Sequence, residues 1–173
     1  MNVIRDRRGA VLAGAVLVAA AAFCGYGAVS YAQARGDDAL AYSRARDQAL
    51  ADGRRGIATL TTLDATTGQR AREGVRAWTR ASTGALRTEL GHTRPAVGAS
   101  ARGTVTEAAV TALDTRAGTA KVIATVRVSV TPKGGGAAST DRKRLEAVLA
   151  RTGDGGWKLK ALNAVPVTGS SQP

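Results

Sequence analysis

The chain has 173 residues and a formal net charge of +12, with 25 Lys and Arg against 13 Asp and Glu. A single Cys excludes an internal disulfide, and one Cys with one His cannot build a zinc site. The basic residues are scattered, aromatic residues make up only 3 % of the chain, and no nucleic-acid-binding motif occurs, so nucleic acid is not an expected partner. A basic surface would instead attract anionic lipid or wall polymer.

The first predicted element is a transmembrane helix over residues 9–34, which contain no charged side chain. A helix of about 20 apolar residues is enough to cross a bilayer. Arg5, Arg7 and Arg8 precede the segment, so the positive-inside rule sets its orientation. We expect a single-pass protein of the cell membrane with a cytoplasmic N-terminus, and with everything after residue 34 extracytoplasmic.

Two alternatives to an anchor remain at this segment. The sequence Ala32-Gln33-Ala34 is a small-x-small site, so a signal peptide cleaved after Ala34 is one of them. The apolar run is longer than the usual signal-peptide core, which favours retention of the segment. A lipoprotein is disfavoured because Phe23 precedes Cys24 and the cysteine lies in the middle of the run.

Small residues recur in the segment at four-residue spacing. In lipid such a face lets a second helix approach closely, so these positions are candidates for packing against a partner helix. The alternative explanation is the general Ala and Gly richness of the chain. The candidates are Gly9, Ala13, Gly14, Ala21 and Gly25.

Three helices are predicted next, over residues 37–63, 68–80 and 82–93. The first has one apolar face, in which Gly53 marks either a close packing contact or, with Gly56, a break. Residues 64–68 form a capping turn before the second helix, and Pro95 ends the third. The face of the first helix consists of Tyr42, Ala45, Ala49, Gly53, Ile57 and Leu60.

Four strands are predicted after the helices. Residues 119–131 alternate between apolar and polar side chains, which indicates a strand with one buried face. Weaker patterns predict strands over 104–113, 142–152 and 157–167, joined by short turns. In the last strand, Trp157, Leu159, Ala161 and Val165 are expected on the buried face. Helices covering one face of a four-stranded antiparallel meander define an α+β domain.

The residue types needed for catalysis are sparse. The only histidine, His92, lies in a loop and is expected at the surface. Glu107 shares the parity of Val105 and Leu113, so it is the one strand carboxylate that could point inward, but no catalytic role is expected for it. Trp78 and Trp157 are interpreted as core anchors. We expect no catalytic set, no metal site and no cofactor.

The order of elements resembles the Mce-associated membrane proteins of actinobacteria. The residues that carry this resemblance are IATLTTLDATT (57–67), the region of Trp78, KVIATVRVSVT (121–131) and RLEAVLARTGDGGWKLKALNAVPV (144–167). That family shares the nuclear transport factor 2-like cone with assembly-factor subunits of type IV secretion systems. The resemblance implies a cytoplasmic tip (1–8), the transmembrane helix (9–34), an extracytoplasmic α+β cone domain (35–167) and a disordered tail (168–173).

The same resemblance implies a non-enzymatic accessory or scaffold subunit. Its protein partners would be components of a Mce-type complex that imports lipids, such as sterols or fatty acids, across the cell envelope. Two alternatives stay open. One is a lipid-binding cone that delivers substrate to a transporter, motivated by the many small side chains expected inside. The other is a conjugation or secretion-channel subunit of the same fold.

Overall fold

The computed structural model describes residues 36–166. The predicted tip, the predicted transmembrane helix and most of the predicted tail lie outside these residues. So do the candidates for orientation and helix packing: Arg5, Arg7, Arg8, Gly9, Ala13, Gly14, Ala21 and Gly25. Within residues 36–166, no helix is both long enough and apolar enough to span a bilayer. The chain divides into two compact units, of which the second begins at Arg44 and holds the α+β domain.

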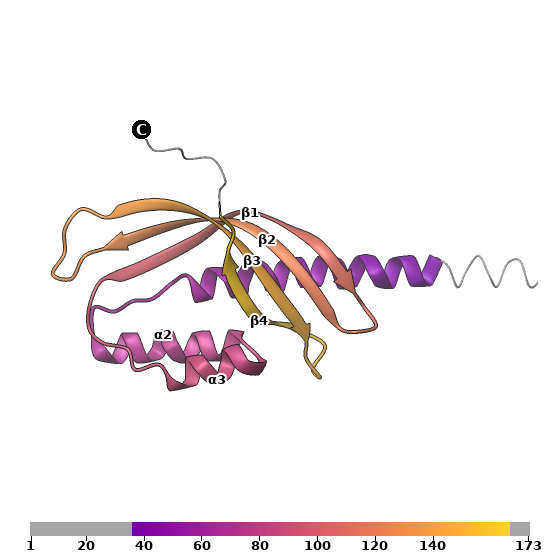
Figure 1. Cartoon of the computed structure of the whole chain (residues 1–173), viewed down its shortest axis with the longest axis horizontal. Helices are drawn as coiled ribbons and strands as arrows, with labels where there is room; N and C mark the ends of the chain where they lie inside the picture. Colours follow the sequence, from indigo (N-terminus) through magenta and orange to yellow (C-terminus); the bar gives the residue numbers. More distant parts are fainter. Residues whose placement is uncertain (1–35, 167–173) are drawn as a thin grey trace, which may run out of the picture. The chain divides into compact units, whose positions relative to one another are not determined.

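The domain contains the predicted order of helices and strands. A long helix occupies residues 36–60, followed by α2 (Gly68–Ala81) and α3 (Gly84–His92). The strands are β1 (Ser100–Asp114), β2 (Thr119–Thr131), β3 (Ser139–Arg151) and β4 (Trp157–Ala164). They pair antiparallel in the order β1-β2-β3-β4, and the helices lie on one side of the curved sheet (Figure 1). The predicted α+β class and the helix-on-meander architecture are therefore confirmed.

The core lies between the helices and the sheet face that meets them. Val122 and Val126 of β2, Leu149 of β3 and Leu159 of β4 are fully buried there, together with Ile57 of the long helix. Alternation along β2 produces this face, since the residues between the buried valines point away from the helices. Aliphatic side chains thus supply most of the hydrophobic stabilisation, as the scarcity of aromatic residues requires.

Two glycines allow the long helix to lie close to the sheet. A methyl group at Gly56 would overlap the Leu159 side chain, and one at Gly53 would lie 3.1 Å from Val122 Cγ2. The helix is continuous through both positions. The glycines therefore mark a close packing contact and not a break. Tyr42, expected on the same face, is 48 % exposed, because it precedes the compact domain that begins at Arg44.

Both edges of the sheet are partly covered by short backbone pairings. Leu63 and Ala101 exchange two hydrogen bonds of 2.8 Å at the β1 edge. At the β4 edge, Ser82 forms a parallel bridge with Leu159, and the Thr83 N–H donates to the Leu159 carbonyl at 2.8 Å. These pairings shield backbone groups that an exposed edge strand would offer to another chain. The Leu63 pairing also explains why the long helix ends before the predicted residue 63.

Three register shifts change which side chains point inward. On β1 the shifts fall between Val105 and Glu107 and between Val110 and Ala112, so Thr106 and Thr111 are the extra residues. Each extra residue inverts the alternation of the strand. Glu107 is consequently exposed, so it does not take the inward position that its parity with Val105 left open.

A third shift lies between β3 and β4, where Lys160 is the extra residue. Ala161 then pairs with Val148 on the face away from the helices, and Leu162 packs against the core in its place. The predicted inward position of Ala161 is therefore wrong, whereas Trp157 and Leu159, which precede the shift, are buried as predicted.

Candidate binding site on the open face of the sheet

The residues singled out for chemistry do not come together. His92 is exposed at the end of α3, and Glu107 is exposed on β1. Among residues 36–166 no group of three His, Cys, Asp or Glu side chains could hold a metal ion. Trp157 is 5 % exposed in the core, and the half-buried Trp78 donates its Nε1–H to the Thr62 carbonyl at 2.8 Å. Trp157 therefore belongs to the core, whereas Trp78 is fixed by its hydrogen bond to the segment before α2.

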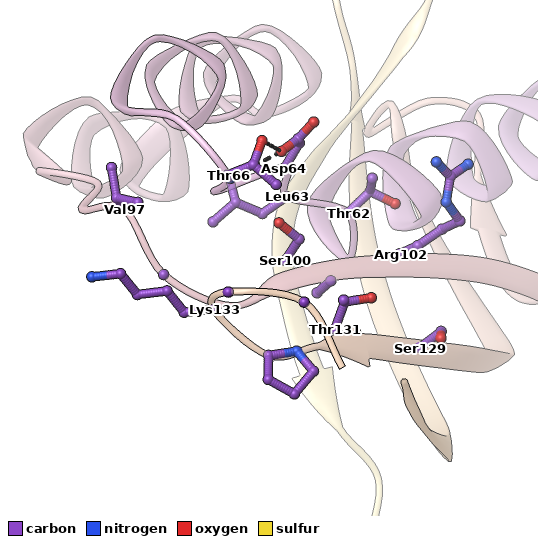
Figure 2. Close-up of a pocket in the computed structure, with 15 residues that line it drawn as sticks. Thr62, Leu63, Asp64, Thr66, Val97, Ser100, Arg102, Ser129, Thr131 and Lys133 are labelled. Atoms are coloured by element: carbon purple, nitrogen blue, oxygen red, sulfur yellow. Dashed lines mark hydrogen bonds between the residues drawn. The ribbon is translucent and has the colours of Figure 1, made fainter. Parts of the chain in front are cut away.

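A cleft of about 530 Å³ opens where β1 begins and β2 ends (Figure 2). One wall is the segment between the long helix and α2, and the other is the β2–β3 hairpin. Its lining combines apolar surface with hydroxyl groups and charged side chains. The hydroxyls belong to Thr62, Thr66, Ser100, Ser129 and Thr131, and the charges to Asp64, Arg102 and Lys133.

The wall before α2 is held by an Asp-centred turn. Asp64 Oδ1 accepts hydrogen bonds from the Thr66 hydroxyl at 2.6 Å and from the Thr66 N–H at 3.0 Å, and Asp64 Oδ2 accepts one from Arg70 at 2.9 Å. These bonds, led by that of the Thr66 hydroxyl, lower the pKa of Asp64. The Ala65 N–H donates to Ser100 Oγ at 2.9 Å and ties the turn to β1. The negative charge in the cleft is therefore already compensated by its neighbours.

The hairpin wall is built from backbone. Gly134 and Gly135 adopt φ of +89° and +83°, a conformation that favours glycine. These two positions add no side chain to the wall, and Lys133 precedes them in the hairpin (Figure 2). Arg102 lines the cleft from β1. Neither cation forms a salt bridge with any carboxylate in the part of the chain that the structure describes.

Next to the cleft, the strands gather four arginines on the open face, by which we mean the sheet face away from the helices. Residues that pair directly in an antiparallel sheet share a face. Arg127 of β2 pairs with Arg142 of β3, and Arg144 pairs with Thr125, a residue of the same parity as Arg127. Arg102 pairs with Ser129. We call Arg102, Arg127, Arg142 and Arg144 the arginine face.

The arginine face carries little compensation. All four arginines are exposed, and none forms a salt bridge within residues 36–166. Lys143 belongs to the opposite face, where its ammonium group donates a hydrogen bond to Asp141 at 2.7 Å. This hydrogen bond is the main reason why the pKa of Asp141 is lowered. The nearest carboxylates on the open face lie beside Arg144: Glu107 is in the same row, across Thr125, and Glu146 follows Arg144 by two residues on β3.

The sequence suggested scattered charges, and this expectation was wrong for the open face. Arg142 and Arg144 are two residues apart and so share a face of β3, and Arg127 is one of the alternating polar residues of β2. The sequence of each strand therefore showed that its own arginines lie on the polar face. The register between strands, which brings the signals together, could not be read from either strand alone. Guanidinium groups bind phosphates and carboxylates through paired N–H donors, so this surface can bind anions.

No protein-family model matches the chain, and no curated protein sequence matches it. Among solved structures, it is similar to an Ntf2 like protein involved in plasmid conjugation, with 14 % identity and a TM-score of 0.49 over 74 % of this chain and 52 % of that one. It is also similar to an IcmL-like type IV secretion system protein from Legionella pneumophila, with 12 % identity and a TM-score of 0.48 over 74 % and 97 % of the two chains.

A third similar structure is a TraE protein in complex with 2-(2-furyl)isonicotinic acid. Here the identity is 11 % and the TM-score 0.45, over 65 % of this chain and 90 % of that one. The chain thus spans about half the length of the conjugation protein and most of the other two. No conclusion about family or function follows at these identities and TM-scores. None of the three is described as a Mce-associated protein.

Proposed function

We propose that this protein is a non-enzymatic, single-pass membrane accessory subunit that stabilises or assembles a lipid-importing complex of the Mce type in the cell envelope. The observation that carries the proposal is the contrast between the two sides of the sheet. The side facing the helices is filled with aliphatic side chains at or near zero exposure. The polar and charged groups are gathered on the open face and around the cleft. Such a domain offers surfaces for binding.

The packed interior favours a scaffold over a lipid-carrying cone. Small side chains were expected to leave a cavity, yet Ala120, Ala124 and Ala147 of the sheet are buried to 2 % exposure or less. The long helix packs directly on the sheet, because Gly53 and Gly56 let its backbone approach Val122, Leu149 and Leu159. A lipid acyl chain would have to displace this packing, at a cost comparable to opening a core.

The membrane tether in this proposal comes from residues 9–34, and the lipid-importing complex comes from the sequence resemblance. A conjugation or secretion-channel subunit of the same architecture is the second candidate, which the sequence resemblance leaves open. The two candidate functions differ in the protein partners that they require. Because neither is enzymatic, only the identity of the partners distinguishes them.

Co-purification from the native host tests the proposal. The full chain, tagged at its C-terminus and extracted in mild non-ionic detergent, is expected to bring down the integral membrane components of a lipid transporter, identified by mass spectrometry. An unrelated single-pass protein with the same tag is the control. Components of a secretion channel would favour the second candidate. A monomer without partners in several mild detergents would contradict both.

A further inference from the structure

We propose that the arginine face, together with the adjoining cleft, binds the phosphate headgroups of anionic phospholipids at the membrane surface. The proposal rests on the membrane tether of the proposed function, and it adds a second contact between this domain and the bilayer. It assigns the headgroups to Arg102, Arg127, Arg142 and Arg144, with Lys133 at the cleft.

The charge arrangement is the first argument. Directly opposite residues in an antiparallel pair have Cβ atoms about 5 Å apart, so Arg127 and Arg142 repel each other across β2 and β3. Arg144 follows Arg142 on the same face of β3, and Arg102 lies diagonally from Arg127 on β1. Four cations held this closely on a rigid sheet, without an ion pair in the described part of the chain, attract a surface of closely spaced anions.

The residues between the arginines are the second argument. Four of them are hydroxyl side chains, namely Thr104, Thr125, Ser129 and Thr140, and the row of Arg144 ends on β1 with the carboxylate Glu107. Hydroxyls and guanidinium groups together provide the donors that phosphate oxygens accept. The nearest large apolar residue of the open face is the half-buried Ile123. It lies outside the arginine face, where it pairs with Glu146 of β3.

This composition disfavours a protein partner. The centre of a protein–protein interface is typically apolar and rich in aromatic residues. A second copy of this chain is also disfavoured, because two arginine faces would repel each other. Arg102 and Lys133 extend the cationic surface into the cleft, where one headgroup would meet the hydroxyls of Ser100 and Thr131.

A tether makes a weak surface interaction effective. One arginine beside an anionic membrane changes an equilibrium constant by about fivefold, and the contributions of several arginines multiply at low salt. A domain anchored to the same membrane needs no further encounter step, so a modest intrinsic affinity suffices to hold it against the bilayer. The interaction is electrostatic and is expected to disappear when salt screens it.

Reactivity of a single cysteine on the arginine face tests the proposal. The full chain carrying Cys24→Ser and Thr104→Cys is reconstituted into phosphatidylcholine vesicles with and without phosphatidylglycerol. The rate of reaction with a membrane-impermeant maleimide is then measured for the outward-facing molecules. Thr104 is exposed and pairs with Arg127, so headgroups bound there would cover it. Thr88→Cys, exposed on α3, is the matched control in the same Cys24→Ser background.

We expect phosphatidylglycerol to slow labelling of the Thr104→Cys variant by about fivefold or more at low salt, with full recovery at about 1 M salt, where the Debye length is about 3 Å. Labelling of the Thr88→Cys variant should not change. Adding Arg127→Gln and Arg142→Gln should abolish the protection without lowering the melting temperature. Equal rates in both vesicle types would overturn the proposal, as would protection that survives in the charge-removed variant.

Protection that appears only in the purified partner complex would also overturn the lipid proposal and would reassign the arginine face to a protein. The two proposals fail separately. Loss of partners in co-purification contradicts the accessory function, whereas lipid-independent labelling contradicts only the headgroup site.

Discussion

At the scale of single residues, Gly56 controls how closely the long helix approaches the sheet. A methyl group there would overlap the Leu159 side chain. Because Leu159 is fully buried, it could move away only by displacing other core residues. We predict that Gly56→Ala lowers the free energy of unfolding by about 1–3 kcal/mol through overpacking, even though alanine is the better helix former. Thermal or urea unfolding of the variant measures this change.

Gly91 in α3 is the matched control for that substitution. A Cβ at Gly91 meets no atom within 4 Å, and its φ lies outside the left-handed range. Gly91→Ala should therefore leave stability unchanged or raise it by up to about 1 kcal/mol. Destabilisation of equal size in both variants would contradict the packing explanation.

Trp157 anchors the start of β4 by its ring and by its backbone. The side chain is 5 % exposed, and its backbone N–H donates to Asp52 Oδ2 of the long helix at 2.9 Å. Its own Nε1–H is buried without a partner among the described residues. We predict that Trp157→Ala costs about 3–5 kcal/mol of unfolding free energy, in the range for truncating a core aromatic.

Trp157→Phe separates the ring from its N–H group. Phenylalanine keeps much of the apolar contact and removes an unpaired buried donor, so its cost should be less than about half that of Trp157→Ala. Urea unfolding of both variants, compared with the wild-type chain, gives the two values. Equal costs would mean that the indole N–H is satisfied in solution.

At the scale of elements, the arginine face carries an internal cost. Arg127 and Arg142 are directly opposite on β2 and β3, and like charges in such a pair are destabilising. We predict that Arg142→Thr raises the free energy of unfolding by about 0.2–1 kcal/mol, while it weakens lipid protection. Urea unfolding at low salt shows the gain best, because salt screens the repulsion.

The control for this element is an exposed arginine without a cross-strand partner. Arg116 lies in the turn between β1 and β2 and is exposed. Arg116→Thr removes the same charge and should change stability by less than about 0.5 kcal/mol. A gain as large as that of Arg142→Thr would indicate a general effect of net charge.

The elements also show where the sequence was informative. The alternation in residues 119–131 predicted β2 with its observed bounds, because a strand with one buried face repeats every two residues. The parity that Glu107 shares with Val105 did not give its orientation, since a bulge inverts parity and nothing in the sequence marks Thr106 as the extra residue. The arginine face was missed for a related reason. It depends on the register between β2 and β3, which is set by the hairpin and the core together.

At the scale of the whole molecule, the core is contained in one compact unit. Its buried residues run from Ala49 to Leu159, all within the unit that begins at Arg44. We predict that residues 35–173, produced without the preceding segment, fold into a soluble domain with a cooperative thermal transition and a mixed helix and strand circular dichroism spectrum. A spectrum of an unfolded chain would contradict the independence of the core from residues 1–34.

The last prediction concerns the segment before the domain. If Gly9, Ala13, Gly14, Ala21 and Gly25 pack against a partner helix, residues 9–34 contribute to assembly as well as to location. Replacing residues 9–34 with an unrelated leucine-rich span of equal length keeps Arg5, Arg7 and Arg8, which we expect to set the orientation, but removes the small-residue faces. We expect the chimera to reach the membrane and to co-purify with less of its partners, measured by quantitative mass spectrometry.

The arginine variants are the complementary control for this exchange. Arg127→Gln with Arg142→Gln leaves the span intact, so it should reduce lipid protection and leave partner recovery unchanged. The span exchange should do the reverse, because a leucine-rich span still inserts while its faces no longer fit a close helix contact. If partner recovery is the same with either span, residues 9–34 serve only as a tether. The partner contacts must then lie on the α+β domain, where the cleft is the next surface to substitute.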